Sequence, residues 1–289
     1  MAQKRKIQVH ALNIRVHPHD GTVYEKLFSN AYRLKQPINA RGDQKLIISS
    51  INEGDHGKTG YITGEIAKFT EIDFDLPWFD VQDMEKADET DLKKIQIPEN
   101  LRPNYISFTF AFKPEQHKFF IETYSSNRTI SPNLIQNFLE HLLNDERMKD
   151  SFSIASVDII SDHEKFEQLF EFRQLKRMQI FIKLPNPDTP RGIEEEVEAR
   201  LRGQNGKSLK MQYEHEDEKS FTPDEKTKQF AQVAMRNGQV DTIGEDENGL
   251  TVTKSSASHP RYEISLYDPN KESRRGVFFR TIGRILASL

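Results

Sequence analysis

Alternating apolar and polar residues open the chain and predict a strand over residues 6–17. The alternation changes phase halfway, which indicates either a β-bulge or a strand that is covered on both faces. The apolar residues of the two phases are Ile7, Val9 and Ala11, followed by Leu12, Ile14 and Val16. Apolar residues at helical spacing then predict a helix over 22–34, and two more strands are expected at 44–52 and 58–72. The acidic stretch that follows, residues 73–100, is interpreted as a linker or a surface excursion.

The central part of the chain shows four strand patterns and two helix patterns in the order ββαβαβ. The strands are expected at 104–112, 117–124, 152–160 and 177–184, and the helices at 131–148 and 163–173. Ser131 is a suitable N-cap for the first helix because its hydroxyl can accept a backbone N–H, and Pro132 fits the first helical position. This order predicts a sheet with its helices on one face.

Three prolines within residues 185–190 interrupt the pattern and begin a C-terminal part. Helices are expected there at 193–203 and 223–238, strands at 209–213 and 262–267, a hairpin at 239–255 and an amphipathic tail after that. Thr222 is the candidate N-cap of the second helix, with Glu225 as its capping-box partner. The dipeptide Asn248-Gly249 marks the turn of the hairpin.

The predicted fold class is therefore α+β, with mostly antiparallel sheets that carry helices on one face. We divide the chain into a β-rich N-terminal part with the acidic linker (residues 1–100) and a central ββαβαβ sheet-and-helix domain (101–186). The remainder, residues 187–289, holds the C-terminal helices, the hairpin and the amphipathic tail.

Composition changes the picture in four respects. The chain has 289 residues, of which 30% are charged and 35% hydrophobic, and nineteen Phe supply enough apolar bulk for folded cores. The absence of Cys excludes disulfides, thiolate metal sites and Cys nucleophiles, and fits a cytoplasmic protein. No apolar run is long enough to span a membrane, so no membrane partner is expected. The net charge of −4 leaves only local basic patches for contact with nucleic acid.

The run "EGDHGKTG" at residues 53–60 looks like the end of a phosphate-binding loop. Such a loop needs a further glycine where this chain has Asn52, and it needs a helix to follow, whereas the next residues read as a strand. We therefore interpret the run as the turn that joins two strands, with Lys58 near its tip. No bound nucleotide or other cofactor is expected.

Metal chemistry has weak support in the sequence. His17 and His19 lie close together, but no pair of His at helical spacing accompanies them, so no metal site is assigned. Four carboxylates could belong to a metal-dependent nuclease if the fold gathered them. They are Asp73, Asp75, Asp158 and Asp241.

The tail, residues 271–289, is the most basic window of the chain, with four Arg and one Lys against one Glu. Arginine offers a planar fork of donors that suits phosphate. We expect a nucleic-acid contact that uses Arg274, Arg275, Arg280 and Arg284, joined by Lys58 and Arg41. The aromatic side chains within the predicted strand 104–112 could stack on bases. Phe108, Phe110 and Phe112, however, fit a hydrophobic core better than a stacking platform.

The same tail has an apolar stripe when drawn as a helix, and a stripe needs a surface to cover it. Docking on the chain's own core, a homo-oligomer contact and a protein partner are all compatible with it. The residues of the stripe that we assign to docking are Phe278, Phe279, Ile282 and Leu286.

Two stretches, "RMQIFIKLPNPD" and "AMRNGQVDTIGEDENGLTVTKSSASHPRYEISLY", resemble an uncharacterised bacterial family known only as a domain of unknown function. The resemblance implies a bacterial cytoplasmic protein in accessory and phage-defence gene neighbourhoods, with a partner encoded by a neighbouring gene. The leading hypothesis is a nucleic-acid-binding effector or sensor, for RNA or single strands. The alternatives are a non-catalytic oligomerising or partner-docking protein and, if the protein is an enzyme, a metal-dependent nuclease whose catalytic residues are unassigned.

Overall fold

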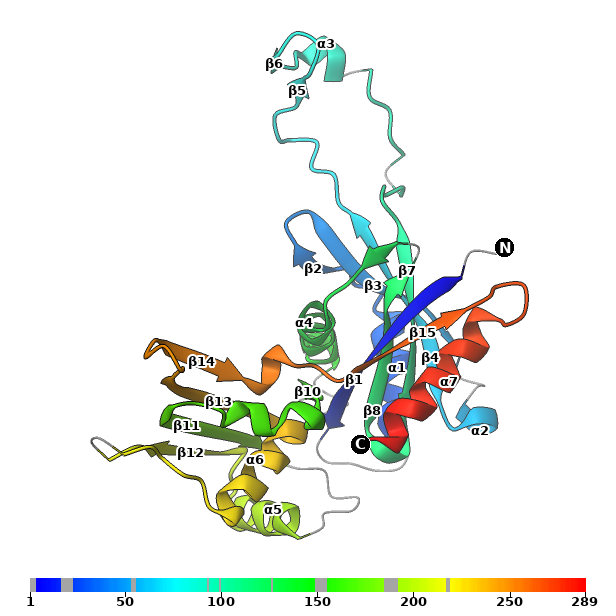
Figure 1. The fold of residues 1–289 in the computed structure, drawn as a ribbon. Helices are drawn as coiled ribbons and strands as arrows, with labels where there is room; N and C mark the ends of the chain where they lie inside the picture. Colours follow the sequence, from blue (N-terminus) through cyan, green and yellow to red (C-terminus); the bar gives the residue numbers. More distant parts are fainter. Residues whose placement is uncertain are drawn as a thin grey trace.

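The computed structural model describes residues 4–16, 23–52, 56–92, 94–98, 100–125, 127–148, 155–184, 192–216 and 219–289. Its strands form a nine-stranded sheet, a four-stranded sheet and a small two-stranded ribbon. The pairings between these strands are antiparallel. Helices accompany both larger sheets (Figure 1). The predicted α+β class with mostly antiparallel sheets is confirmed.

The nine-stranded sheet draws strands from all three parts into which the sequence was divided. They are β1 (Arg5–Val16), β2 (Ile38–Arg41), β3 (Gln44–Asn52), β4 (Ile62–Thr70), β7 (Ile106–Lys113), β8 (Lys118–Ser125), β9 (Arg128–Thr129), β10 (Ala155–Ile159) and β15 (Tyr262–Tyr267). The order is β10-β1-β8-β7-β4-β3-β2, and β15 and β9 pair additionally with β1 and β8. The outer edge of β1 is thus shared between β15 and β10.

The change of phase in β1 has one of its two predicted causes, cover on both faces. The register of β1 against β8 shifts between Gln8 and Val9, before the change of phase at Ala11 and Leu12, so this irregularity does not produce it. From Val9 to Val16 every residue of β1 is buried, so both faces of the strand are covered. A strand buried on both faces gains from apolar residues in both phases.

Helices lie on both faces of this sheet. The helices α1 (Val23–Arg33) and α4 (Pro132–Leu143) cover one face, where Phe108, Phe110 and Phe112 are fully buried, so their prediction as core residues is confirmed. The C-terminal helix α7 (Arg274–Ala287) covers the opposite face, where β1 and β8 present aliphatic and aromatic side chains. The sheet is therefore the middle layer of three.

The four-stranded sheet contains β12 (Ser208–Glu214), β11 (Gln174–Lys183), β13 (Gly238–Glu245) and β14 (Thr251–Ser255), in that order. Apolar residues of β11 pack against α5 (Ile193–Gly203) and α6 (Glu225–Asn237), and this forms a separate core. β13 and β14 make the hairpin that Asn248-Gly249 predicted, and Gly249 has the positive φ of 78° that its turn needs. The central part of the chain is divided, because β11 belongs here while β7, β8 and β10 belong to the larger sheet.

A buried polar network joins the two sheets. Arg15 of β1 is fully buried and donates to Asp158 of β10, and Lys183 of β11 lies 2.7 Å from the same carboxylate. Asn237 at the end of α6 accepts from Asn13 at 3.2 Å and from Arg15 at 3.3 Å. Burying a charge is costly unless well-placed hydrogen bonds and opposite charges compensate for the lost hydration. Because these contacts form in only one arrangement, the network constrains how the two sheets meet.

Two local predictions differ from the structure and one is confirmed. Residues 163–173 form two short 3-10 turns, His163–Lys165 and Glu167–Leu169, in place of a helix. Phe166 and Leu169, three residues apart, are both buried, which matches the three-residue period of a 3-10 helix. The N-cap of α6 is Asp224 and not Thr222, since the Asp224 carboxylate accepts the Thr227 N–H at 2.7 Å. Ser131 caps α4 as predicted.

Residues 71–105, which we call the arm, leave the end of β4 and return at the start of β7. Because β4 and β7 are neighbours in the sheet, the arm is an excursion from the ends of two interior strands and not a linker between parts. Figure 1 shows it projecting far from the rest of the chain, with its small elements near the tip. These are β5 (Phe79–Asp80), β6 (Glu85–Lys86) and α3 (Glu89–Leu92).

Candidate functional site

The apolar stripe of α7 is used within the chain. Phe278 and Ile282 are fully buried in a cluster with residues of β1, β7 and β8. Phe279 and Leu286 lie partly buried at the margin of this cluster, and the Phe279 ring centre is 5.4 Å from that of Tyr61. The structure thus places all four predicted docking residues against the chain's own sheet, and Phe278 and Ile282 have no surface left for a partner.

Arg274, the first residue of α7, binds a buried carboxylate. Its Nη2 donates to Glu122 Oε2 at 2.7 Å, and its Nε lies 3.1 and 3.2 Å from the two carboxylate oxygens. Glu122 on β8 is only 1% exposed. Burial raises the pKa of Glu122, and the hydrogen bonds from Arg274 act against that rise. The positive charge of Arg274 is therefore engaged by a charge that the fold has already buried.

Two more tail arginines also have intramolecular contacts. Arg280 forms an ion pair with Glu272, and this contact holds the pKa of Glu272 below its usual range. Arg284 donates to the backbone carbonyl of Ile264 at 3.2 Å and to the Ser265 hydroxyl. Arg284 thereby covers part of the outer edge of β15, a common protection of edge strands.

The remaining predicted cations do not gather with these. The Arg275 guanidinium lies over the Phe279 ring, 5.5 Å from its centre. Lys58 belongs to α2 (His56–Thr59), just beyond the end of β3, whereas Arg41 lies just before its start. Both side chains are exposed, but a nine-residue strand separates them by about 30 Å. The structure does not combine the six predicted cations into one patch.

The glycine-rich run is the connection between two paired strands, as predicted. β3 and β4 are antiparallel neighbours, and the described part of the run, residues 56–60, is one helical turn that leads into β4. Residues 53–55 lie outside the described residues. A four-residue helix cannot supply the row of free N–H groups on which a phosphate loop depends.

The four carboxylates of the nuclease hypothesis are not gathered into one site, because they lie on β10, on β13 and on the arm. Asp158 is engaged by Arg15 and Lys183, and Asp241 on β13 accepts from Gln239 at 2.8 Å. Asp73 and Asp75 lie on the arm. Within the described residues no group of three His, Asp or Glu side chains could hold a metal ion. His17 and His19 lie outside those residues.

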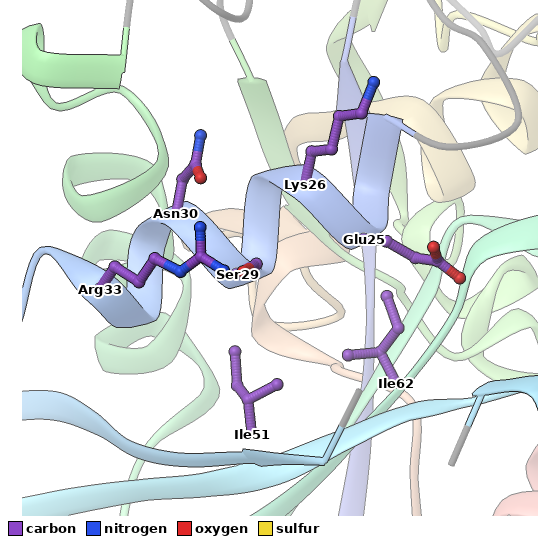
Figure 2. Close-up of a pocket in the computed structure, with 7 residues that line it drawn as sticks. All are labelled: Glu25, Lys26, Ser29, Asn30, Arg33, Ile51 and Ile62. Carbon is purple, nitrogen blue, oxygen red and sulfur yellow. The ribbon is translucent and has the colours of Figure 1, made fainter. Parts of the chain in front are cut away.

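A pocket of about 250 Å³ lies between α1 and the β3–β4 end of the sheet. Figure 2 shows Ile51 and Ile62 pointing toward the helix, while Lys26 extends away from them. Arg33 runs along the helix, and Glu25 lies at the other end of the pocket. The charged groups diverge, so the pocket offers no convergent set of polar atoms of the kind that fixes a ligand.

A second polar group lies beside the junction of the sheets. Arg236 Nε donates to His163 Nε2 at 3.2 Å, and burial with the charge of Arg236 lowers the pKa of His163. Burial lowers the pKa of Lys118 to about 8, and the positive charge of Arg236 adds to the effect. Asn237 donates to Glu194 at 2.6 Å, which places an opposing carboxylate nearby. Glu194 offsets part of the positive charge of Lys118 and Arg236.

The arm is the most unusual surface of the chain, because apolar side chains are exposed along it. Of the twelve large apolar side chains exposed in the described residues, eight belong to the arm, so exposure is concentrated there. They are Phe74, Leu76, Phe79, Val81, Met84, Ile97, Leu101 and Tyr105. Single exposed apolar residues are normal, but a group of this size on one projection marks an interaction surface.

The arm is also strongly acidic. Its 35 residues include ten Asp or Glu and four Lys or Arg, a net charge of −6, whereas the rest of the chain has 35 acidic and 37 basic residues, a net charge of +2. Local hydrogen bonds from Asp side chains shape its turns, such as Asp80 Oδ1 accepting the Gln82 N–H at 2.7 Å. The carboxylates thus serve the turn geometry and give the projection a uniform sign of charge.

The base of the arm is tied to the sheet, and a groove lies between its two limbs. Arg102 Nε is 2.6 Å from Glu71, which links the limbs by an ion pair. The groove has a volume of about 880 Å³ and is lined by apolar side chains that include Ile72, Phe74 and Ile97. The fixed base and apolar lining make this end of the arm a surface with a defined shape.

Sequence reasoning located the arm but not its exposed apolar residues. In the run "DFDLPWFDV", apolar residues alternate with aspartates and a proline. Such alternation is typical of a strand with one buried face. In the described residues no other element covers this segment, so its apolar side chains are exposed.

Comparison with curated proteins finds no significant match. A family model, by contrast, matches residues 5–283 and so spans both sheets, the arm and most of α7. No helix in the described part of the chain is long and apolar enough to cross a membrane. The chain belongs to the uncharacterised family described as a domain of unknown function, DUF4747.

Proposed function

We propose that the chain is a docking protein that binds a basic partner protein through the arm. The observation that carries this proposal is the concentration of exposed apolar side chains on one acidic projection. Apolar anchors such as Phe79 and Met84 supply the favourable burial, and the surrounding carboxylates select a partner with positive charge.

The magnitude of the exposed area supports a stable contact. Phe79 is 60% exposed, Val81 75% and Met84 73%, all within six residues at the tip. Burying most of such a side chain contributes about 1.5–3 kcal/mol each, before the costs of association. Three to five anchors of this kind are what a standard interface concentrates near its centre.

The charge distribution separates this proposal from nucleic-acid binding. A projection of net charge −6 repels phosphate, so the arm itself is unsuited to a nucleic-acid strand. Binding through the tail stays a prediction, and Arg274, Arg280 and Arg284 would have to exchange their intramolecular partners for phosphate. A role in phage defence also stays a prediction.

Site-specific photo-cross-linking tests the proposal. A photoreactive phenylalanine analogue is placed at Phe79 and, as a control, at Leu250, which is 64% exposed at the tip of the β13–β14 hairpin. In the bacterium that carries the gene, position 79 should cross-link to one protein with a basic surface, and position 250 should not. Equal products at both positions would contradict the proposal.

The captured protein must then bind in purified form. Its affinity should fall at least tenfold with Phe79→Ser, Val81→Ser and Met84→Ser combined, and it should weaken as salt is added. The matched control replaces exposed apolar residues elsewhere, Leu250→Ser, Ile264→Ser and Leu266→Ser. If the captured protein is a second copy of this chain, the arm mediates self-association, and docking to a different protein is refuted.

A further inference from the structure

A separate pocket lies at the base of the arm, on the face of the nine-stranded sheet that also carries α1 and α4. Lys68 follows the buried Ile66 two residues later on β4, so the two side chains leave the same face of the sheet. The short strand β9 forms another wall of the pocket. Lys68 Nζ donates to the carbonyl of Thr129 in this strand at 3.4 Å. The pocket has a volume of about 460 Å³, within the range of small-ligand sites.

The lining of this pocket is cationic. Lys68 and Arg128 both line it, and none of its lining residues is a carboxylate. Among the described residues, the Arg128 side chain has neither a hydrogen bond nor an ion pair. Burial lowers the pKa of Lys68, and the positive charge of Arg128 adds to the effect because like charges repel. An anion between them would remove this repulsion.

Neutral donors accompany the two cations. The Tyr124 hydroxyl donates to Asn127 Oδ1 at 2.8 Å, which fixes the amide and leaves its Nδ2 hydrogens without an acceptor in the described residues. Asn104 Nδ2 donates to Thr70 Oγ1 at 3.2 Å, so the Thr70 hydroxyl hydrogen is available in the same way. Asn104 and Asn127 have φ values of 59° and 60°, a left-handed conformation that asparagine tolerates.

We propose that this pocket binds a phosphate group, held by Lys68 and Arg128 and by the Asn127 amide and the Thr70 hydroxyl. Arginine and lysine together offer a planar donor fork and a compact charge, and amide and hydroxyl donors can occupy the remaining phosphate oxygens. The phosphate can belong to a free mononucleotide or to a nucleotide within a single strand. This site is distinct from the tail arginines and does not depend on docking through the arm.

Isothermal titration with three probes tests the proposal. The probes are inorganic phosphate, uridine monophosphate and a hexamer of uridylate, each added to the full chain at low and at moderate salt. The test variant carries Lys68→Gln and Arg128→Gln. The control carries Lys210→Gln and Arg200→Gln, which remove the same charges from exposed positions on β12 and α5. Circular dichroism shows that each variant is folded.

We expect at least one nucleotide probe to bind, and the test variant to lose at least tenfold in affinity while the control stays within twofold of the wild type. A monophosphate that binds as well as the hexamer identifies a free nucleotide as the ligand, and a hexamer that binds far better identifies a strand. Equal losses in both variants would show general electrostatic attraction and overturn the site. Absence of binding by all three probes would also overturn it.

Discussion

Replacing Asp158 by asparagine should destabilise the whole protein, because Asp158 is the carboxylate that compensates the buried charge of Arg15. Arg15 is fully buried, and Lys183 also lies 2.7 Å from Asp158. The variant retains the size of the side chain but leaves two cations facing a neutral amide. Lys183 is partly exposed and can turn toward Glu140, 3.8 Å away, so the main cost comes from Arg15.

Removing one partner of a buried ion pair typically costs about 3–5 kcal/mol. A natural domain has a free energy of unfolding of about 5–15 kcal/mol, so the loss is a large part of the total. With a urea m value of about 3 kcal/mol/M, the unfolding midpoint should fall by roughly 1–1.7 M.

Urea unfolding, followed by circular dichroism at pH 7, measures this shift. The control is Glu245→Gln, which removes the partner of the more exposed cations Arg173 and Lys176 and should shift the urea midpoint much less. The double variant Arg15→Met with Asp158→Leu should recover most of the loss, since it leaves no buried charge at either position. Equal losses from Asp158→Asn and Glu245→Gln would refute the reasoning.

Three further predictions concern other groups. Arg274→Ala should lower the free energy of unfolding at pH 7 by about 1–3 kcal/mol, because it leaves Glu122 unpaired, and the loss should shrink as the pH is lowered and Glu122 becomes protonated. Burial lowers the pKa of His10 to about 4 from 6.5, so the unfolded state binds the proton more tightly, and stability should fall as the pH drops from 6.5 to 4. This contribution of up to about 3 kcal/mol should disappear in His10→Gln, and identical pH profiles of the urea midpoint in variant and wild type would contradict it. If the tail binds single strands, Arg280→Gln with Arg284→Gln should weaken the gel shift and reduce the slope of log K against log salt by about 1.4, and an unchanged slope would exclude these two contacts.

Local features of the fold could be predicted well because their causes lie within a few residues. Ser131 and Pro132 determine the start of α4 by their own chemistry, and the hydroxyl accepts the Leu134 N–H at 3.2 Å. The phase change in β1 indicated correctly that both faces of the strand are covered. The cap of α6 was misplaced by two residues, since both Thr222 and Asp224 are suitable caps and only the surrounding fold decides between them.

Contacts between distant segments could not be predicted in the same way. The tail arginines stood out by local charge, but the residue that engages Arg274 is Glu122, 152 positions earlier in the chain. The pairing of Arg15 with Asp158 spans 143 positions, and neither neighbourhood hints at the other. The phosphate pocket could not be predicted for the same reason. Lys68 and Arg128 are isolated cations in their own strands, and only the folded chain brings β9 next to Lys68.

The position of β1 has a consequence for synthesis of the chain on the ribosome. The outer edge of β1 next to residues Arg5–His10 receives its partner only from β15, which is made about 250 residues later. Until then the backbone of this strand edge is unpaired. The side chains of Ile7 and Val9 also remain exposed, because α7, which buries them, has not yet been made. Open apolar edges are sites of aggregation, so a chain that stops before residue 262 should be retained by chaperones or degraded. A chain that stops before β15 is therefore marked by this unpaired edge of β1.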